Sequence, residues 1–557
     1  MLEMKHKLSD WFAISVYFIV IFVPIILAID RLIWVAGFDP ITWFSSLEKN
    51  FISQGVIGFT IIQAILSTLL TVVIGIPIAW QLGRYKWRYE SLIKAILTMP
   101  FVMPSIVVAM GFLQIIGSNG LDIRDDNSTW LFTLIIAHAW FNLALVIRFC
   151  EPVLSNLSPE YLDQLKLLPE GRNALNRVRL LWVPILYPSI IAAACMTFVF
   201  SFTSFALVKW ITIGDNTLES MMAGLGMSAG ISDYMISHNQ IIISASIIQF
   251  CVLAIALYIV TKIQQKRQTR LEISSQKFVK SENKKGWFVL APAIFFALTP
   301  LIVVFISSFR IRNVGASGEN YSWSFGAWNY AFSNSNSLSS ASEAILNSLG
   351  YAFTTVLFAI PIGWFLASSI VKIEKSNRRL ARILDFFVMI PFAISSVMIG
   401  LGVMIGMIKI NPEFFYSIWI TPVLAHVMIT TPFVVRILLS SQRTLPIEYE
   451  EAGMVLGMNC WQRFSKIRLP LMKHSLFIAI IFTIAISLGE FGASWVVTRN
   501  SEWTTLPILI DSLKGIPYNN SLTTPAASAV ASILMILTII IFTVSEKFRK
   551  STNRGMF

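Results

Sequence analysis

The sequence is poor in charge and in paired cysteine, and both shortages limit what it can be. Only 13% of its 557 residues are charged while 55% are hydrophobic, a balance outside the range of soluble globular domains. No CxxC spacing occurs, which argues against a disulfide framework or a zinc site. The cysteines are interpreted as packing residues: Cys150, Cys195, Cys251 and Cys460.

Catalytic motifs are also missing. No GxxxxGK[ST] phosphate loop occurs, so we do not expect the chain to hydrolyse a nucleotide itself. No Ser/His/Asp grouping and no cluster of metal ligands is recognisable, so we expect neither an enzyme nor a resident metal or cofactor. In a soluble protein, a net charge of +13 would suggest a nucleic-acid partner. In a membrane protein, an excess of basic residues instead indicates which segments face the cytoplasm, so no nucleic-acid partner is expected.

Long apolar runs are abundant, and the mean hydropathy is +0.70. About twenty apolar residues cross a hydrocarbon core roughly 30 Å thick, because a helix satisfies its own backbone polar groups. The runs predict an all-α, polytopic membrane protein with about twelve transmembrane helices. They lie at approximately 11–29, 55–82, 91–117, 129–150, 183–209 and 240–263, and then at approximately 287–309, 344–371, 382–409, 415–440, 473–498 and 523–546.

The basic residues give the predicted orientation. Most of the 43 lysines and arginines fall in alternate segments between the apolar runs. By the positive-inside rule those segments face the cytoplasm, which predicts a multi-pass protein of the cell membrane with both termini inside. The first run is not interpreted as a signal peptide, because no small-residue cleavage site follows it.

The two halves of the sequence resemble each other. AHAWFNLALVIRF at 137–149 matches AHVMITTPFVVRI at 425–437. Because six spans return the chain to its starting side, both halves run in the same direction, which predicts two parallel six-helix repeats about a pseudo-twofold axis. We expect a first repeat at 1–260, a basic cytoplasmic linker at 261–286 and a second repeat at 287–557.

One polar segment lies between two hydrophobic spans of the second repeat. Residues 448–470 read EYEEAGMVLGMNCWQRFSKIRLP, with a Glu-Ala-Gly triplet, then Gly457, then Ile-x-Leu-Pro. The pattern resembles the cytoplasmic coupling loop, often called the EAA loop, of ABC importer permeases. We expect a short helix, a turn at Gly457 where a side chain would be penalised, and a second short helix.

The triplet supplies the candidate coupling residues. Glu448 and Glu451 are three residues apart and so share one face of a helix, while Ala452 and Gly453 would let another protein approach closely. The first repeat keeps only the frame, with Gly171 in LDQLKLLPEGRNALNRVRLLWVP and no triplet. The resemblance implies that both loops dock on a separate ATP-binding cassette subunit, expected to be a homodimer, with Glu451 making the stronger contact.

An ionisable group within a span usually lines a cavity or has a partner. Glu490 in AISLGEFGASW aligns with Ser204 in FSFTSFALVKW, and Phe491 aligns with Phe205. We expect these four residues at the translocation pathway. Glu490 is either a cavity-facing carboxylate that attracts a cation or a structural hydrogen-bonding residue, and the sequence leaves both open.

The repeat also pairs two histidines and two arginines. His138 and His426 are interpreted as satisfied core histidines. Arg148 and Arg436 lie at the inner ends of their spans and are interpreted as anchors.

The resemblance covers nearly the whole chain and is closest to fused, two-copy type I permeases of the thiamine and ferric-iron importer group. The segments SFTSFA, SLGEFGA and LTIIIFTVSEKFR are more similar to the thiamine permeases. This implies transport of a small solute, which is thiamine or alternatively ferric iron or another solute. The solute would be received from an extracytoplasmic substrate-binding protein. The chain itself would be surrounded by membrane lipid. A competing hypothesis, an ion-coupled secondary transporter, would need no coupling loop.

Overall fold

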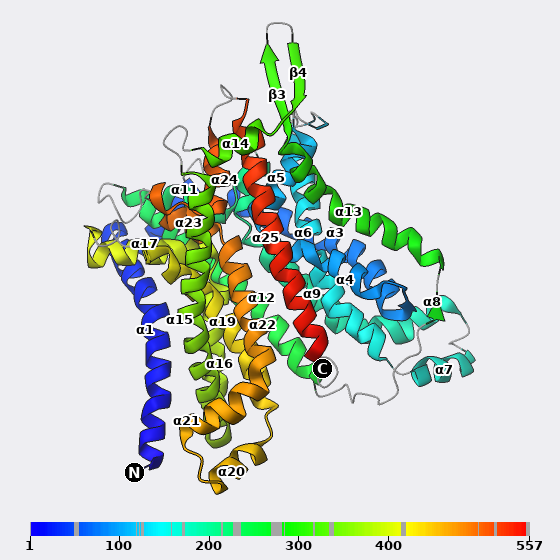
Figure 1. Ribbon diagram of the computed structural model, residues 1–557, viewed down its shortest axis with the longest axis vertical. Helices are drawn as coiled ribbons and strands as arrows, with labels where there is room; N and C mark the ends of the chain where they lie inside the picture. Colours follow the sequence, from blue (N-terminus) through cyan, green and yellow to red (C-terminus); the bar gives the residue numbers. More distant parts are fainter. Residues whose placement is uncertain are drawn as a thin grey trace.

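The computed structural model shows a bundle of long helices with two short pairs of strands (Figure 1). It describes residues 2–49, 55–117, 120–121, 123, 127–157, 159–169, 173–212, 216–226, 235–268, 281–282, 284–315, 318–333, 339–413, 419–498, 501–516 and 521–552.

The first half begins with α1 (Leu2–Ala36), α2 (Pro40–Lys49), α3 (Val56–Arg84), β1 (Tyr85–Lys86), α4 (Glu90–Thr98), η2 (Met99–Val102), α5 (Ser105–Ile116) and α6 (Asn127–Asn156). It continues with α7 (Pro159–Leu167), α8 (Ala174–Arg177), η4 (Val178–Trp182), α9 (Val183–Phe202), α10 (Ala206–Ile211), α11 (Leu218–Gly226) and α12 (Ile236–Gln268).

The second half begins with β2 (Ser281–Glu282), η5 (Lys284–Gly286), α13 (Trp287–Ser307), β3 (Arg310–Gly315), β4 (Gly318–Trp323), α14 (Gly326–Phe332), α15 (Ala341–Ser376), α16 (Arg378–Met389), η6 (Ile390–Ala393) and α17 (Ser396–Ile410). It continues with α19 (Thr421–Arg443), α20 (Ile447–Val455), α21 (Cys460–Arg463), η7 (Phe464–Arg468), α22 (Leu469–Gly489), α23 (Gly492–Val497), η8 (Ser501–Trp503), α24 (Leu506–Gly515) and α25 (Thr523–Thr552).

Ten helices in the described part of the chain are long and apolar enough to cross a membrane. They lie within α1, α3, α6, α8–α9, α12, α13, α15, α19, α21–α22 and α25. The prediction of an all-α, polytopic membrane protein is confirmed.

The third span of each half differs from its prediction, because it is broken. In the first half the range 91–117 forms α4 and α5, which meet at 97°. Pro100 and Pro104 lie at this break. Proline has no N–H to donate and disfavours helical geometry at the residue before it. Met103, which precedes Pro104, is extended with a ψ of 139°, and the helix is interrupted there. The range 382–409 is divided in the same way at Pro391, between α16 and α17.

Small residues set the packing inside each half. A Cβ added to Gly75 of α3 would lie 2.6 Å from the Cβ of Val146 on α6. The same close approach recurs between Gly363 of α15 and Val434 of α19. Glycine lets paired helices meet closely where no hydrophobic effect drives association.

The first span of each half packs against helices of the other half. Helix α1 packs against α15 and α17, while α13 packs against α5 and also touches α3 and α4. The hydroxyl of Tyr17 donates to the carbonyl of Val388 at 3.0 Å, and the indole of Trp140 donates to the carbonyl of Phe296 at 2.9 Å. The two halves are therefore interlocked.

The two ends of the bundle differ (Figure 1). The marked chain ends, α20 and α21 lie toward one end, which we call the termini end. The antiparallel pair β3–β4, with Arg310 opposite Trp323, projects from the other, which we call the hairpin end. Helices α11, α23 and α24 lie toward the hairpin end.

Candidate functional site

The polar segment of the second half forms the predicted helix, turn and helix. Helix α20 ends in a turn at Gly457, whose φ is +73°. The N–H of Met458 donates to the carbonyl of Gly453 at 2.9 Å, and the N–H of Gly457 donates to that of Met454 at 3.0 Å. This pair of bonds is a Schellman motif, which requires the left-handed conformation that glycine adopts without penalty.

An ion pair then fixes α20 against the following turn. The Arg468 side chain donates to the carboxylate of Glu450, and this hydrogen bond holds the pKa of Glu450 below its ordinary value of 4.5. A Cβ on Gly453 would lie 2.7 Å from Cδ1 of Ile467. The small size of Gly453 thus serves packing within this chain.

The remaining candidate coupling residues face outward. Glu448, Glu451 and Ala452 are exposed. Three large apolar side chains beside them are also exposed, namely Val455 (88%), Leu456 (74%) and Trp461 (72%). Apolar side chains gathered on a polar segment outside the spans are a feature of interaction surfaces.

The corresponding segment of the first half consists of α7, α8 and the turn η4. Gly171 lies outside the described residues. Leu167 and Leu175 are 84% and 74% exposed, and Lys166 pairs with Asp163 of the same helix at 2.9 Å. This segment also presents apolar side chains, but it lacks the Glu-Ala-Gly triplet of α20.

A cavity of about 310 Å³ lies between the two halves. Its wall comes from the broken third spans and from α6, α9, α19 and α22. The segments that directly follow α9 and α22, residues 203–207 and 490–492, complete it. All four residues predicted for the pathway line it: Ser204, Phe205, Glu490 and Phe491. The rings of Phe205 and Phe491 stack with centroids 5.4 Å apart at 16°.

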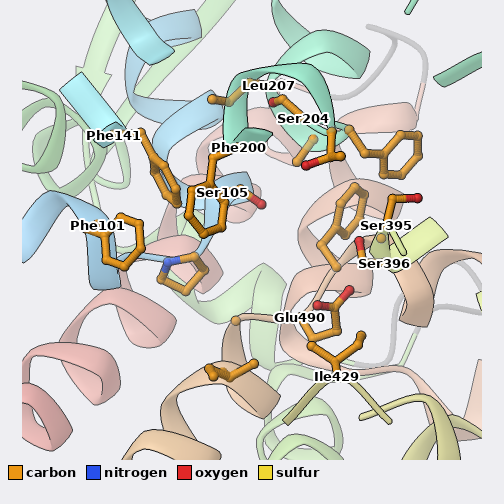
Figure 2. A pocket seen from close by; sticks show the side chains of 18 of the residues that line it. Phe101, Ser105, Phe141, Phe200, Ser204, Leu207, Ser395, Ser396, Ile429 and Glu490 are labelled. Carbon is orange, nitrogen blue, oxygen red and sulfur yellow. The ribbon is translucent and has the colours of Figure 1, made fainter. Parts of the chain in front are cut away.

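Glu490 is both hydrogen-bonded to the backbone and part of the cavity wall. Its carboxylate accepts from the N–H of Ala493 at 2.9 Å, at the positive N-terminal end of α23. The residue is also partly exposed and belongs to the cavity wall. Figure 2 shows it on the same side of the cavity as Ser395 and Ser396. Glu490 therefore both bonds to the backbone and presents its carboxyl group to the cavity.

Phenyl rings form the facing wall. Figure 2 shows Phe101, Phe141 and Phe200 together across the cavity from Glu490. Phe101 lies 5.9 Å from Phe141 and 5.4 Å from Phe200, between ring centroids. The cavity thus combines a carboxyl group and hydroxyls with a cluster of three phenyl rings opposite Glu490 (Figure 2).

The paired histidines differ in their partners. His426 is buried, with Nδ1 2.8 Å from the hydroxyl of Ser487 and Nε2 2.8 Å from that of Ser494. His138 is buried in the cavity wall, with Nδ1 3.2 Å from the hydroxyl of Ser67. Its Nε2 has no partner within the described part of the chain. The prediction of a satisfied core histidine is confirmed for His426 and is only half right for His138.

The sequence did not reveal two further polar clusters at the hairpin side of the cavity. Lys209 of α10 contacts Asp511 of α24. Glu219 of α11 accepts from the amide of Gln249 at 2.5 Å and from the N–H of Val397 at 3.2 Å, and burial raises its pKa to about 7. Lys209 lies at the end of the predicted span 183–209, where a lysine is usually an interfacial anchor. The neighbouring sequence therefore gives no indication that Lys209 is buried between the halves.

Two parallel helical repeats that interlock across a membrane and enclose a cavity at their interface define a solute permease. The chain belongs to the family of binding-protein-dependent transport system inner membrane components, whose sequence model matches it twice, at residues 71–270 and 359–550. It is the permease subunit of an ABC importer, with both repeats in one chain.

Named relatives support the same class. The thiamine transport system permease protein ThiP of Haemophilus influenzae is 24% identical over 521 residues, which cover 90% of this chain and 89% of the relative. ThiP of Brucella abortus is 23% identical over 525 residues, covering 89% and 88%. The sulfate transport system permease protein CysW of Escherichia coli is 29% identical over 216 residues, covering 36% and 72%.

Proposed function

We propose that this permease imports thiamine or a closely similar aromatic cation. The observation that carries the proposal is the cavity wall, which opposes the Glu490 carboxylate to a cluster of phenyl rings. Thiamine carries a positively charged thiazolium ring and an aromatic aminopyrimidine. A carboxylate and aromatic faces in a desolvated cavity both attract such a cation. The two ThiP relatives, similar over about nine tenths of the chain, support this solute.

A separate ATP-binding subunit, acting as a homodimer, would supply the energy. The α20 segment and the α7–α8 segment each expose apolar side chains, one in each half. A symmetric dimer has two equivalent docking surfaces, which suits two such segments related by a pseudo-twofold axis. In this proposal Glu448, Glu451 and Ala452 contact the subunit, and Gly457 shapes the loop. Gly171 would do the same in the first repeat.

The distribution of basic residues supports an orientation in the membrane. We propose that the termini end and both coupling segments lie in the cytoplasm. The linker at 261–286, which joins the repeats at 1–260 and 287–557, would lie there too. The hairpin end would then receive the solute from a substrate-binding protein outside the cell membrane.

The test is uptake of radiolabelled thiamine by proteoliposomes that contain the chain, its ATP-binding subunit and its binding protein. Glu490→Gln keeps the shape of the side chain and removes its charge, so we expect uptake to fall about tenfold, as for loss of one charged hydrogen-bonding group. Glu413→Gln, which changes an exposed carboxylate, should leave uptake unchanged. Co-purification of the ATP-binding subunit should be the same for both variants.

Two results would contradict separate parts of the proposal. Uptake that persists without any ATP-binding subunit, driven by an ion gradient, would remove the ATP-driven mechanism. ATP-dependent uptake of another solute, with no competition by thiamine, would remove the solute assignment alone.

A further inference from the structure

Lys209 is held by one carboxylate and four aromatic rings at the hairpin side of the cavity. Its Nζ lies 2.7 Å from both carboxylate oxygens of Asp511. The same carboxylate accepts from the indole N–H of Trp210 at 2.8 Å and from that of Trp495 at 2.9 Å. Lys209 and Trp210 belong to the first half, whereas Trp495 and Asp511 belong to the second. The cluster therefore joins the two halves.

Aromatic rings surround the ammonium group. Its Nζ lies 4.3 Å from the ring centroid of Trp495 and 5.4 Å from that of Trp210. The rings of Phe491 and Phe205 lie 5.6 and 5.9 Å away. The lysine and aspartate side chains are only 24% and 13% exposed. A carboxylate with several aromatic faces around one cation is the arrangement by which proteins recognise organic ammonium ligands.

The cluster lies on the axis that relates the repeats. Phe205 and Phe491 occupy equivalent positions and stack on each other. Lys209 and Trp495 are also equivalent, four residues further along each half, and are in contact. Residues that touch their own equivalents lie on a twofold axis. Phe205 and Phe491 also line the cavity, and Asp511 lies on α24 toward the hairpin end (Figure 1).

We propose that Phe205, Trp210, Phe491, Trp495 and Asp511 form a second cation-binding site, the axial cage, which Lys209 fills while the pathway is closed. Separation of the halves at the hairpin end would withdraw Lys209 with α10, which also carries Trp210 and has Phe205 as its N-cap residue. The part of the axial cage contributed by the second half would remain, namely the Asp511 carboxylate beside the rings of Phe491 and Trp495. The positive group of an entering solute then takes the place of Lys209. This inference rests on the proposed import of an organic cation and adds an entry site to it.

The experiment measures binding of radiolabelled tetramethylammonium to the full chain in lipid nanodiscs by equilibrium dialysis. Lys209→Met removes the charge that fills the axial cage and keeps an apolar stem, so we expect at least tenfold tighter binding than in the unaltered chain. Adding Asp511→Asn to this variant should return binding to the level of the unaltered chain. That double variant assigns the binding to the axial cage, because it leaves Glu490 intact.

Lys409→Met is the matched control. It removes a lysine that pairs with Asp30, away from the axis, and should bind tetramethylammonium as the unaltered chain does. Equal binding by Lys209→Met and the unaltered chain, or tight binding that survives Asp511→Asn, overturns the axial cage. If Lys209→Met does not give a monodisperse protein, Lys209→Gln is measured against the same criteria. Because this probe shares only its charge with thiamine, the outcome is independent of thiamine uptake.

Discussion

The paired histidines show how one difference between the repeats alters a buried hydrogen-bond network. Ser494 supplies the hydroxyl that contacts Nε2 of His426. The equivalent position in the first half is Val208, which is buried and has no polar atom to offer. An imidazole nitrogen left without a partner in a buried site costs roughly 1–3 kcal/mol. In the first half this unpaired nitrogen is Nε2 of His138, in the wall of the cavity.

A hydroxyl introduced at Val208 should repair the network. We expect Val208→Ser to melt at a higher temperature than Val208→Ala, because both remove the same methyl groups and only serine can bond to His138. The difference should correspond to about 1 kcal/mol, the usual net value of one hydrogen bond. Thermal unfolding of the purified variants in one detergent measures it. Coincident melting curves would mean that the hydroxyl does not reach Nε2.

Helix α20 owes its position to contacts inside its own segment rather than to the membrane. The Schellman turn at Gly457, the packing of Gly453 on Ile467 and the Glu450–Arg468 pair hold it against η7. If α20 docks on the ATP-binding subunit as proposed, a helix fixed in this way would transmit the movement of that subunit to α22, because η7 continues directly into that span. Of these contacts, the ion pair is the one that an isosteric substitution of Glu450 can remove.

We expect Glu450→Gln to loosen α20 and to weaken binding of the ATP-binding subunit several-fold. Amide hydrogen exchange over 447–468 should become faster. Glu374→Gln is the control, since it breaks a similar but more exposed pair with Arg443, and should change neither quantity. Unchanged exchange in Glu450→Gln would show that the ion pair does not hold the helix.

The pH dependence of α20 has a defined sign. Because the pKa of Glu450 is lower in the folded protein than its ordinary value of 4.5, the pair contributes its full stability above about pH 4.5. That contribution is lost as the pH falls through the lowered pKa. Exchange over 447–468, corrected for its intrinsic pH dependence, should stay level from pH 7 to pH 5 and rise only in stronger acid.

At the scale of the whole molecule, the sequence predicts what depends on position along the chain and misses what depends on lateral neighbours. Hydropathy located the spans, and the repeat brought Glu490 and Phe491 to the same cavity as Ser204 and Phe205. The breaks at Pro100 and Pro391 were missed, because a hydropathy average is not sensitive to a lost backbone N–H. Nothing in either half indicates that Lys209 meets Asp511, since the two residues meet only after the halves interlock.

The exchange of first spans is the largest of these lateral features. Helix α1 covers α15 and α17 of the second half, and α13 packs on α5 and α25. A half that folded alone would leave these grooves without the helix that fills them, and would leave the Val388 carbonyl without the hydroxyl of Tyr17. The covalent linker, in contrast, contributes the short pairing of β2 with β1 and the approach of Gly286 to Gln81 and Trp87.

We therefore expect a chain cut between residues 270 and 271 to assemble when its two fragments are produced together. The fragments should co-purify and support uptake at about the level of the intact chain, because the contacts of α1 and α13 hold them, whereas neither fragment alone should be monodisperse. The same cut combined with removal of residues 2–36 is the control, and should abolish co-purification or uptake. A second fragment that is stable by itself would show that α1 is dispensable to the half it covers, and that the interlocked arrangement contributes little to the stability of the permease.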